Sequence, residues 1–246
     1  MVGRSAAQET AECKFTYTVE RILVGDKVVR VELYHPTSPG SHPLALVLHG
    51  SAGVYTVRGS QPPSPSNLGE DALAKDCYVV ALPHYFDAIG AVSVLDQARL
   101  KMLFPDLKKV VMAVLDTEAG LPDTRNRGIL LCGESYGGFL AIAIAEDDSR
   151  VSAVSVYGAA LPPGDFQPTR NHLPPLLIQH GENDTVVPLE GARRLSEIWQ
   201  SSGAIAKLIV YPDVGHYFSV ESRAQRLENT RRWFAQFAEP SSIHPY

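Results

Sequence analysis

Residues 129–138 read ILLCGESYGG, and this stretch decides the fold. The apolar run Ile129–Cys132 predicts a strand buried on both faces, and the nearly all-apolar run Tyr136–Ala145 predicts a helix packed on most sides. Between them lies a Gly-x-Ser-x-Gly pattern. Its turn is so tight that the residues two positions either side of Ser135 must lack a Cβ atom. The stretch therefore predicts a serine hydroxyl above the end of a sheet, although a glycine-rich turn with an incidental serine has the same letters.

Apolar or alternating runs elsewhere predict further strands, and amphipathic runs between them predict helices. The other expected strands are Phe15–Ile22, Val28–Tyr34, Leu44–Leu48, Tyr78–Leu82, Val151–Tyr157, Leu176–Gln179 and Lys207–Tyr211. The other expected helices are Asn67–Lys75, Asp106–Glu118, Leu189–Ser202 and Arg223–Phe237. Two leading strands followed by strand–helix alternation predict an α/β fold. Its sheet is mostly parallel and eight-stranded, with helices on both faces and no separate lid domain.

The whole chain, residues 1–246, is expected to form one domain, with residues 1–13 and 239–246 at its periphery. Two irregular stretches, Val57–Ser66 and Gly158–Pro175, interrupt the strand–helix alternation. Loops of that length in a compact domain are usually either functional or disordered.

Charge and hydropathy narrow the class of protein. A net charge of -5 with interspersed acids and bases gives no basis for a nucleic-acid surface. The N-terminal sequence MVGRSAAQETAEC lacks the apolar core of a secretory signal, and the longest apolar runs are shorter than a membrane span. We therefore expect a cytoplasmic protein that binds neither nucleic acid nor a membrane and is a monomer or a small homo-oligomer.

The three cysteines, Cys13, Cys77 and Cys132, lie too far apart for the short ligand spacings of a structural metal site. Cys77 and Cys132 lie in or beside apolar runs, and we interpret them as buried thiols. Free thiols favour a reducing compartment. No metal or other cofactor is expected.

A serine hydroxyl becomes a nucleophile when a base takes its proton and a third group orients the base. In strand–turn–helix proteins of this kind, the partners follow in the order Ser, Asp or Glu, His, each after a later strand. Asp184 follows the penultimate predicted strand, and His216 follows the last one. Glu182 and Asp213 are rival acids, which we expect to cap a helix or to solvate a loop. The candidate catalytic residues are therefore Ser135, Asp184 and His216.

An oxyanion hole is expected from the loop after Leu44–Leu48, which reads HGSAG at 49–53. The hole needs one N–H group from this loop and one from the residue after the nucleophile. Ser51 is the first choice in the loop, with Ala52 second, and Tyr136 is expected to supply the other N–H. His49 is expected to brace the loop.

Aromatic residues gather near the predicted strand ends, as the walls of a substrate pocket require. Tyr85, Phe86 and Tyr217 are the candidate pocket residues, with Tyr136 as a further one. Some of these aromatic side chains must belong to the core, and the sequence does not sort them.

Taken together, these motifs resemble the dienelactone hydrolase family of α/β-hydrolases over residues 15–238. The resemblance rests on the HGSAG loop, LPHYF at 82–86, GESYGG at 133–138, HGENDTVVP at 180–188 and GHYF at 215–218. It implies an α/β-hydrolase fold and a hydrolase with its active site at the carboxyl ends of the strands.

The chain departs from that family in two places. The founding members that it resembles use a cysteine nucleophile and a glutamate just after the third strand, where this chain has Ser135 and Gly50. They also hold a substrate carboxylate with arginines, one after the fourth strand and one past the histidine. The matching positions here carry no arginine, although Arg223 lies nearby. A neutral ester is therefore expected rather than an anionic dienelactone.

The sequence thus predicts a serine hydrolase that cleaves small to medium carboxylic esters through an acyl-enzyme. A lactonase or dienelactone hydrolase, a thioesterase and a small peptidase use the same three residues and stay open as alternatives. A small-molecule receptor on a hydrolase scaffold is an alternative of another class, because the fold alone does not fix the function.

Overall fold

The computed structural model describes residues 12–54, 68–124, 126–164, 166, 168 and 173–238. Its sheet has eight strands in the order β1-β2-β4-β3-β5-β6-β7-β8. The strands are β1 (Phe15–Val24), β2 (Lys27–Pro36), β3 (Leu44–Leu48), β4 (Val79–Pro83), β5 (Ile129–Glu134), β6 (Val151–Tyr157), β7 (Leu176–Gly181) and β8 (Ala206–Tyr211). β2 pairs antiparallel with β1 and with β4, and every other pair is parallel. The prediction of a mostly parallel, eight-stranded sheet is confirmed.

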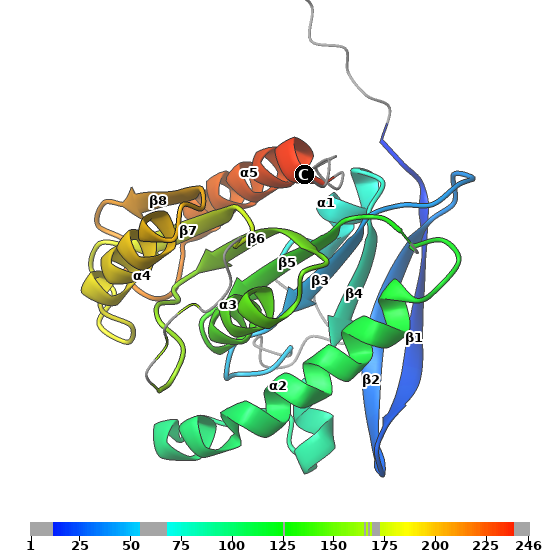
Figure 1. Cartoon of the computed structure of the whole chain (residues 1–246), viewed down its shortest axis with the longest axis horizontal. Coiled ribbons are helices and arrows are strands. Elements are labelled where there is room, and N and C mark those ends of the chain that lie inside the picture. Colours follow the sequence, from blue (N-terminus) through cyan, green and yellow to red (C-terminus); the bar gives the residue numbers. More distant parts are fainter. Residues whose placement is uncertain are drawn as a thin grey trace, which may run out of the picture.

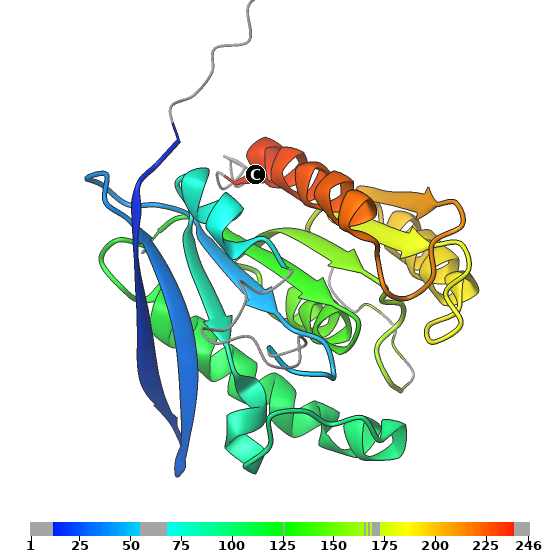
Figure 2. The ribbon, with the colours of Figure 1, turned by 180° about the vertical axis from the view of Figure 1, so that it is seen from behind.

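Helices cover both faces of the sheet (Figures 1 and 2). They are α1 (Glu70–Lys75), the short 3-10 helix Tyr85–Ile89, α2 (Gln97–Ala119), α3 (Tyr136–Asp147), α4 (Leu189–Ser201) and α5 (Val220–Phe237). α2, α3 and α4 lie in front of the sheet in Figure 1, and α1 and α5 lie in front when the molecule is turned in Figure 2. This layering is the α/β-hydrolase architecture that the sequence motifs imply.

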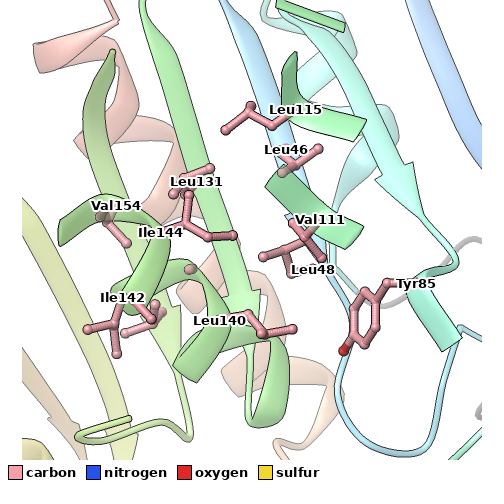
Figure 3. Close-up of a cluster of buried hydrophobic side chains, with 14 of the residues drawn as sticks. Leu46, Leu48, Tyr85, Val111, Leu115, Leu131, Leu140, Ile142, Ile144 and Val154 are labelled. Carbon is pink, nitrogen blue, oxygen red and sulfur yellow. The ribbon is translucent and has the colours of Figure 1, made fainter. Parts of the chain in front are cut away.

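The strands are apolar on both sides because both sides are covered. In β3, Leu44, Leu46 and Leu48 pack into the core beneath α2 and α3, whereas Ala45 and Val47 point into the second core on the side of α1 and α5. Figure 3 shows the first core, where Leu46 and Leu131 lie against side chains of α2 and α3. Each fully buried leucine contributes about 1.5–3 kcal/mol of transfer free energy, which favours the fully covered sheet.

The start of α2 differs from the prediction. We expected a helix from Asp106 after Pro105, but α2 begins at Gln97, and that prediction is wrong. The side chain of Asp96 accepts a hydrogen bond from the Arg99 N–H at 2.7 Å and caps the helix there. The buried stripe of α2 runs through Leu100, Phe104, Leu107, Val111 and Val114, so packing carries the helix across the proline.

Two cysteines are joined, which corrects the interpretation of Cys77 as a free thiol. Cys13, just before β1, forms a disulfide with Cys77, just after α1, with a Cα–Cα distance of 5.3 Å. Disulfides persist in oxidising environments, so the inference of a reducing compartment loses its basis. Cys132 is a buried free thiol as expected, and burial raises its pKa to about 12.

Some expectations lie outside the described residues. Among them are the irregular stretch Val57–Ser66, most of the first thirteen residues and residues 239–246. Among the helices of the described part of the chain, none combines the length and the apolar character that crossing a membrane requires.

We predict that replacing both Cys13 and Cys77 by serine lowers the free energy of unfolding by about 2–4 kcal/mol, because the bond restricts the unfolded chain across a sequence separation of 64 residues. Urea denaturation of wild type and variant, each with and without reductant, measures the effect. Reductant should lower the stability of the wild type to the level of the variant. Titration of the denatured, unreduced wild type should find one free thiol per chain, and three would contradict the bond.

Candidate active site

Ser135 lies at the sharp turn between β5 and α3 with a left-handed backbone, φ +50°. A residue with a side chain holds such a conformation at a cost of about 1–3 kcal/mol, so the surroundings must impose it. Two hydrogen bonds do so: the Ser135 N–H donates to the Tyr157 carbonyl at 2.9 Å, and the Ser135 carbonyl accepts from the Phe139 N–H at 3.1 Å. The predicted strand–turn–helix geometry is therefore present at this serine.

The two glycines of the pattern are required by backbone contacts. A Cβ atom at Gly133 would lie 2.5 Å from the carbonyl oxygen of Gly137. A Cβ atom at Gly137 would lie 2.2 Å from the carbonyl oxygen of Leu48 at the end of β3. Backbone cannot yield as a flexible side chain does, so the steric reason given for the glycine pattern is confirmed.

The structure brings Ser135, Asp184 and His216 together. Asp184 lies in the loop after β7, and His216 lies in the loop after β8. The His216 Nδ1–H donates to Asp184 Oδ2 at 2.8 Å, and the Ser135 Oγ–H donates to His216 Nε2 at 3.0 Å. An unbroken chain of hydrogen bonds thus runs from the carboxylate through the imidazole to the hydroxyl.

Gly158 makes room for this arrangement. Its φ is +56°, and a Cβ atom on it would lie 3.2 Å from His216 Cε1 and 3.7 Å from Asp184 Oδ2. The sequence analysis placed Gly158 only at the start of an irregular stretch. A glycine directly after a buried strand that neighbours the nucleophile strand is the signal that could have singled it out.

The Asp184 carboxylate is buried and held by several donors. Its Oδ1 accepts hydrogen bonds from the Val186 and Val187 N–H groups at 2.9 and 2.8 Å. Its Oδ2 faces His216 and lies 3.4 Å from the His180 Nε2 atom. The rival acids, Glu182 and Asp213, are exposed at the surface. Asp184 is therefore the carboxylate that meets the histidine.

The HGSAG loop after β3 lies against Ser135. A Cβ atom on Gly50 would lie 3.5 Å from Ser135 Cβ. The Gly50 carbonyl accepts from the His49 Nδ1–H at 2.8 Å and from the Gly53 N–H at 3.0 Å. Because a trans peptide directs its N–H opposite to its carbonyl, the Ser51 N–H points away from these groups. Of the two predicted donors, Ser51 directly follows Gly50 and Tyr136 directly follows Ser135.

His49 braces this loop from inside the protein. It is buried, its ring stacks on Tyr85 with centroids 4.0 Å apart, and the Tyr85 hydroxyl donates to its carbonyl. Burial lowers the pKa of His49 to about 3, so its ring is neutral. A neutral ring with its hydrogen on Nδ1 can keep the bond to the Gly50 carbonyl.

The candidate pocket residues separate into two groups. Tyr85 and Phe86 are buried in the core that Figure 3 shows in part, although Phe86 also contributes to a hollow beside His49. Tyr136 is buried as well, and its hydroxyl donates to the Leu100 carbonyl of α2 at 2.9 Å. Tyr217 is 79 % exposed and lies edge-on to the His216 ring. Of these aromatic residues, Tyr217 offers the largest open surface beside the histidine.

Sequence reasoning missed a buried arginine beneath the site. The Arg226 guanidinium lies over two aromatic rings. Its Cζ atom is 3.5 Å from the centre of the Tyr157 ring and 5.5 Å from the centre of the Phe218 ring. The Tyr157 carbonyl accepts a hydrogen bond from the Ser135 N–H, and Phe218 follows His216 by two residues. Through these cation–π contacts, Arg226 connects α5 to the end of β6 and to the segment that follows His216. Nothing in the sequence singles out Arg226, because α5 carries three other arginines, Arg223, Arg231 and Arg232.

The described residues form no group of three or more His, Cys, Asp and Glu side chains arranged to hold a metal ion.

Comparison with known proteins gives the family context. The family model described as the dienelactone hydrolase family matches residues 29–238. A Salmonella typhimurium protein provisionally named carboxymethylenebutenolidase is 26 % identical over 147 residues, and the alignment spans 52 % of this chain and 54 % of that protein. The chain thus aligns with about half the length of this curated relative.

Solved structures show the same fold. A provisionally named dienelactone hydrolase of Klebsiella pneumoniae superposes with a TM-score of 0.73 at 18 % identity, covering 91 % of this chain and 100 % of that one. A dienelactone hydrolase of Anabaena variabilis superposes with a TM-score of 0.68 at 17 % identity, covering 92 % of this chain and 99 % of that one.

The depressed pKa of His49 predicts a pH dependence of stability. The unfolded chain binds a proton at this histidine below its ordinary pKa of about 6.5, whereas the folded protein excludes that proton down to a pKa of about 3. Stability therefore falls as the pH is lowered, by about 2 kcal/mol between pH 7.5 and pH 5 from this residue. Urea denaturation of the wild type and of His49→Asn at both pH values measures it. Equal losses in both proteins would contradict the assignment.

Proposed function

We propose that this chain, which belongs to the dienelactone hydrolase family of hydrolases, cleaves carboxylic esters through a covalent acyl-enzyme on Ser135. The observation that carries the proposal is the chain of hydrogen bonds from Asp184 through His216 to Ser135, with lengths of 2.8 and 3.0 Å. These are the distances at which a general base takes the proton of a nucleophile.

In the first step, Ser135 Oγ attacks the ester carbonyl carbon, and its proton passes to His216 Nε2. Asp184 accepts the hydrogen bond from His216 Nδ1–H, which fixes the tautomer of the ring and stabilises the imidazolium. The carbonyl oxygen becomes an oxyanion, and the N–H groups of Ser51 and Tyr136 stabilise it. The Tyr136 group lies at the N-terminus of α3, where the helix dipole adds to the effect.

The tetrahedral intermediate then collapses. The bond to the alcohol oxygen breaks, His216 Nε2 gives its proton to that oxygen, and the acyl group stays on Ser135. A water molecule attacks the acyl-enzyme with His216 again as the base, and the carboxylic acid is released as Ser135 regains its proton.

The surface beside the site supports a neutral ester with a modest apolar group. The segment 92–102 lies against the proposed oxyanion donors, because the Val94 N–H donates to the Ser51 carbonyl at 2.9 Å. Val92, Leu95 and Met102 on this segment are each about 70 % exposed. Val92 and Leu95 lie close in sequence to Val94, and Tyr217 contacts the His216 ring, so we propose these exposed side chains as apolar contacts for an acyl or alcohol group.

Lactone hydrolysis is the second candidate, and family membership favours it. A lactone is a cyclic ester, so the same steps open its ring and the leaving oxygen stays attached to the acyl group. A substrate panel of p-nitrophenyl esters, neutral lactones, anionic lactones and thioesters, compared by kcat/KM, separates the classes.

We expect Ser135→Ala and His216→Ala each to lower kcat for p-nitrophenyl acetate by about 10³-fold or more, because the three residues act as a unit. A fluorophosphonate should label the wild type at Ser135 and should not label Ser135→Ala. Exposed Asp213, the rival acid, gives the matched control: Asp213→Asn should keep near-wild-type kcat, whereas Asp184→Asn should not.

Absence of turnover, or turnover unchanged in Ser135→Ala, would favour a receptor on a hydrolase scaffold over an enzyme. Near-full activity of His216→Ala would reject this histidine as the base.

A further inference from the structure

His180 lies one residue before the end of β7, and its side chain is completely buried. Its Nε2 atom is 2.8 Å from the Val187 carbonyl oxygen and 3.4 Å from Asp184 Oδ2. Its Nδ1 atom has no hydrogen-bond partner among the described residues. Both neighbours of Nε2 are acceptors, so the geometry assigns the ring hydrogen to Nε2.

The contacts of His180 surround the Asp184 carboxylate. The Nε2–H donates to the Val187 carbonyl, while the Val187 N–H donates to Asp184 Oδ1 at 2.8 Å. The same Nε2–H lies within electrostatic reach of Asp184 Oδ2, the oxygen that binds His216. His180 therefore contacts one carboxylate oxygen directly and the other through the backbone of Val187, whose carbonyl and N–H groups lie on either side of its Cα atom.

We propose that His180 is a positioning residue that holds the Asp184 carboxylate in the plane that faces His216 Nδ1. The carboxylate has one soft torsion, and rotation about it would carry Oδ2 away from the imidazole. The N–H groups of Val186 and Val187 fix one oxygen, and His180 keeps the second one in line. This role rests on the proposed function, in which Asp184 orients His216.

A purely structural histidine would fill space at the end of β7 and would act independently of Asp184. The two roles differ in whether the effect of losing His180 depends on the presence of the Asp184 carboxylate. If His180 acts through Asp184, its loss has no further effect once the carboxylate is gone, whereas lost packing lowers activity by the same factor in either background.

A double-mutant cycle tests the proposal on the full-length protein with p-nitrophenyl acetate. His180→Phe keeps a planar ring without an N–H donor and should lower kcat by about 10–100-fold with KM nearly unchanged. His180→Gln returns a donor near the position of Nε2 and should recover kcat to within about 5-fold of wild type. In the Asp184→Asn background, His180→Phe should change kcat by less than about 3-fold.

A remote pair serves as the matched control. His35 Nδ1 lies 3.0 Å from Asp123 Oδ2, near the amino-terminal edge of the parallel strands. His35→Phe should therefore leave kcat unchanged. Equal losses from His180→Phe in the wild-type and Asp184→Asn backgrounds, or no recovery in a folded His180→Gln variant, would overturn the proposal.

Proton NMR keeps this test independent of turnover. The hydrogen-bonded His216 Nδ1–H proton should give a downfield signal that persists in His180→Gln, weakens in His180→Phe and disappears in Asp184→Asn. If these signals behave so while no Ser135-dependent turnover is found, the positioning role stands and the proposed function fails. An unchanged signal in a folded His180→Phe variant rejects the positioning role.

Discussion

The close approach of backbone to backbone at the turn that carries Ser135 is the constraint on which the rest of this site depends. The first turn of α3 lies against the end of β3, and a single Cβ atom at Gly137 would overlap the carbonyl of Leu48. This contact holds the first turn of α3 against β3, and the hydrogen bonds of the Ser135 N–H and carbonyl groups hold that residue in its left-handed conformation. Because β5, β7 and β8 end at the same edge of the sheet, the loops with Asp184 and His216 meet the hydroxyl there.

Local patterns predicted the parts of the fold that local physics controls. The strand with residues 44–48 could be placed from its unbroken apolar run, because a strand covered on both faces needs apolar residues at every position. The turn at Ser135 could be placed because only glycine fits beside it. The order of Asp184 and His216 along the chain, after successive parallel strands, matches the order expected of the acid and the base and disfavours Asp213, which follows the last of these strands. Glu182 follows the same strand as Asp184, so chain order does not separate these two acids. The structure separates them, because Glu182 is exposed whereas Asp184 lies 2.8 Å from His216 Nδ1.

Long-range contacts decided what the sequence could not predict. Pro105 with Asp106 is typical of a helix start, but the turns of α2 before Pro105 pack against Tyr136, which lies more than thirty residues further along the chain. The Cys13–Cys77 bond joins residues whose proximity follows only from the assembled sheet. Tyr85 could have lined a cleft or filled the core. Its stacking on His49 places it in the core, and no periodicity in its own segment indicates that.

The distance along the chain between Ser135 and His216, 81 residues, has a consequence for biosynthesis. Three strands, β6, β7 and β8, separate the two side chains, and each must join the sheet before the hydroxyl meets the imidazole. A nascent chain on the ribosome therefore cannot assemble this constellation until β8 and the loop with His216 have emerged, however early the N-terminal half folds. Under the proposed mechanism, premature termination before that point leaves Ser135 without its base, so truncated translation products would lack the proposed activity.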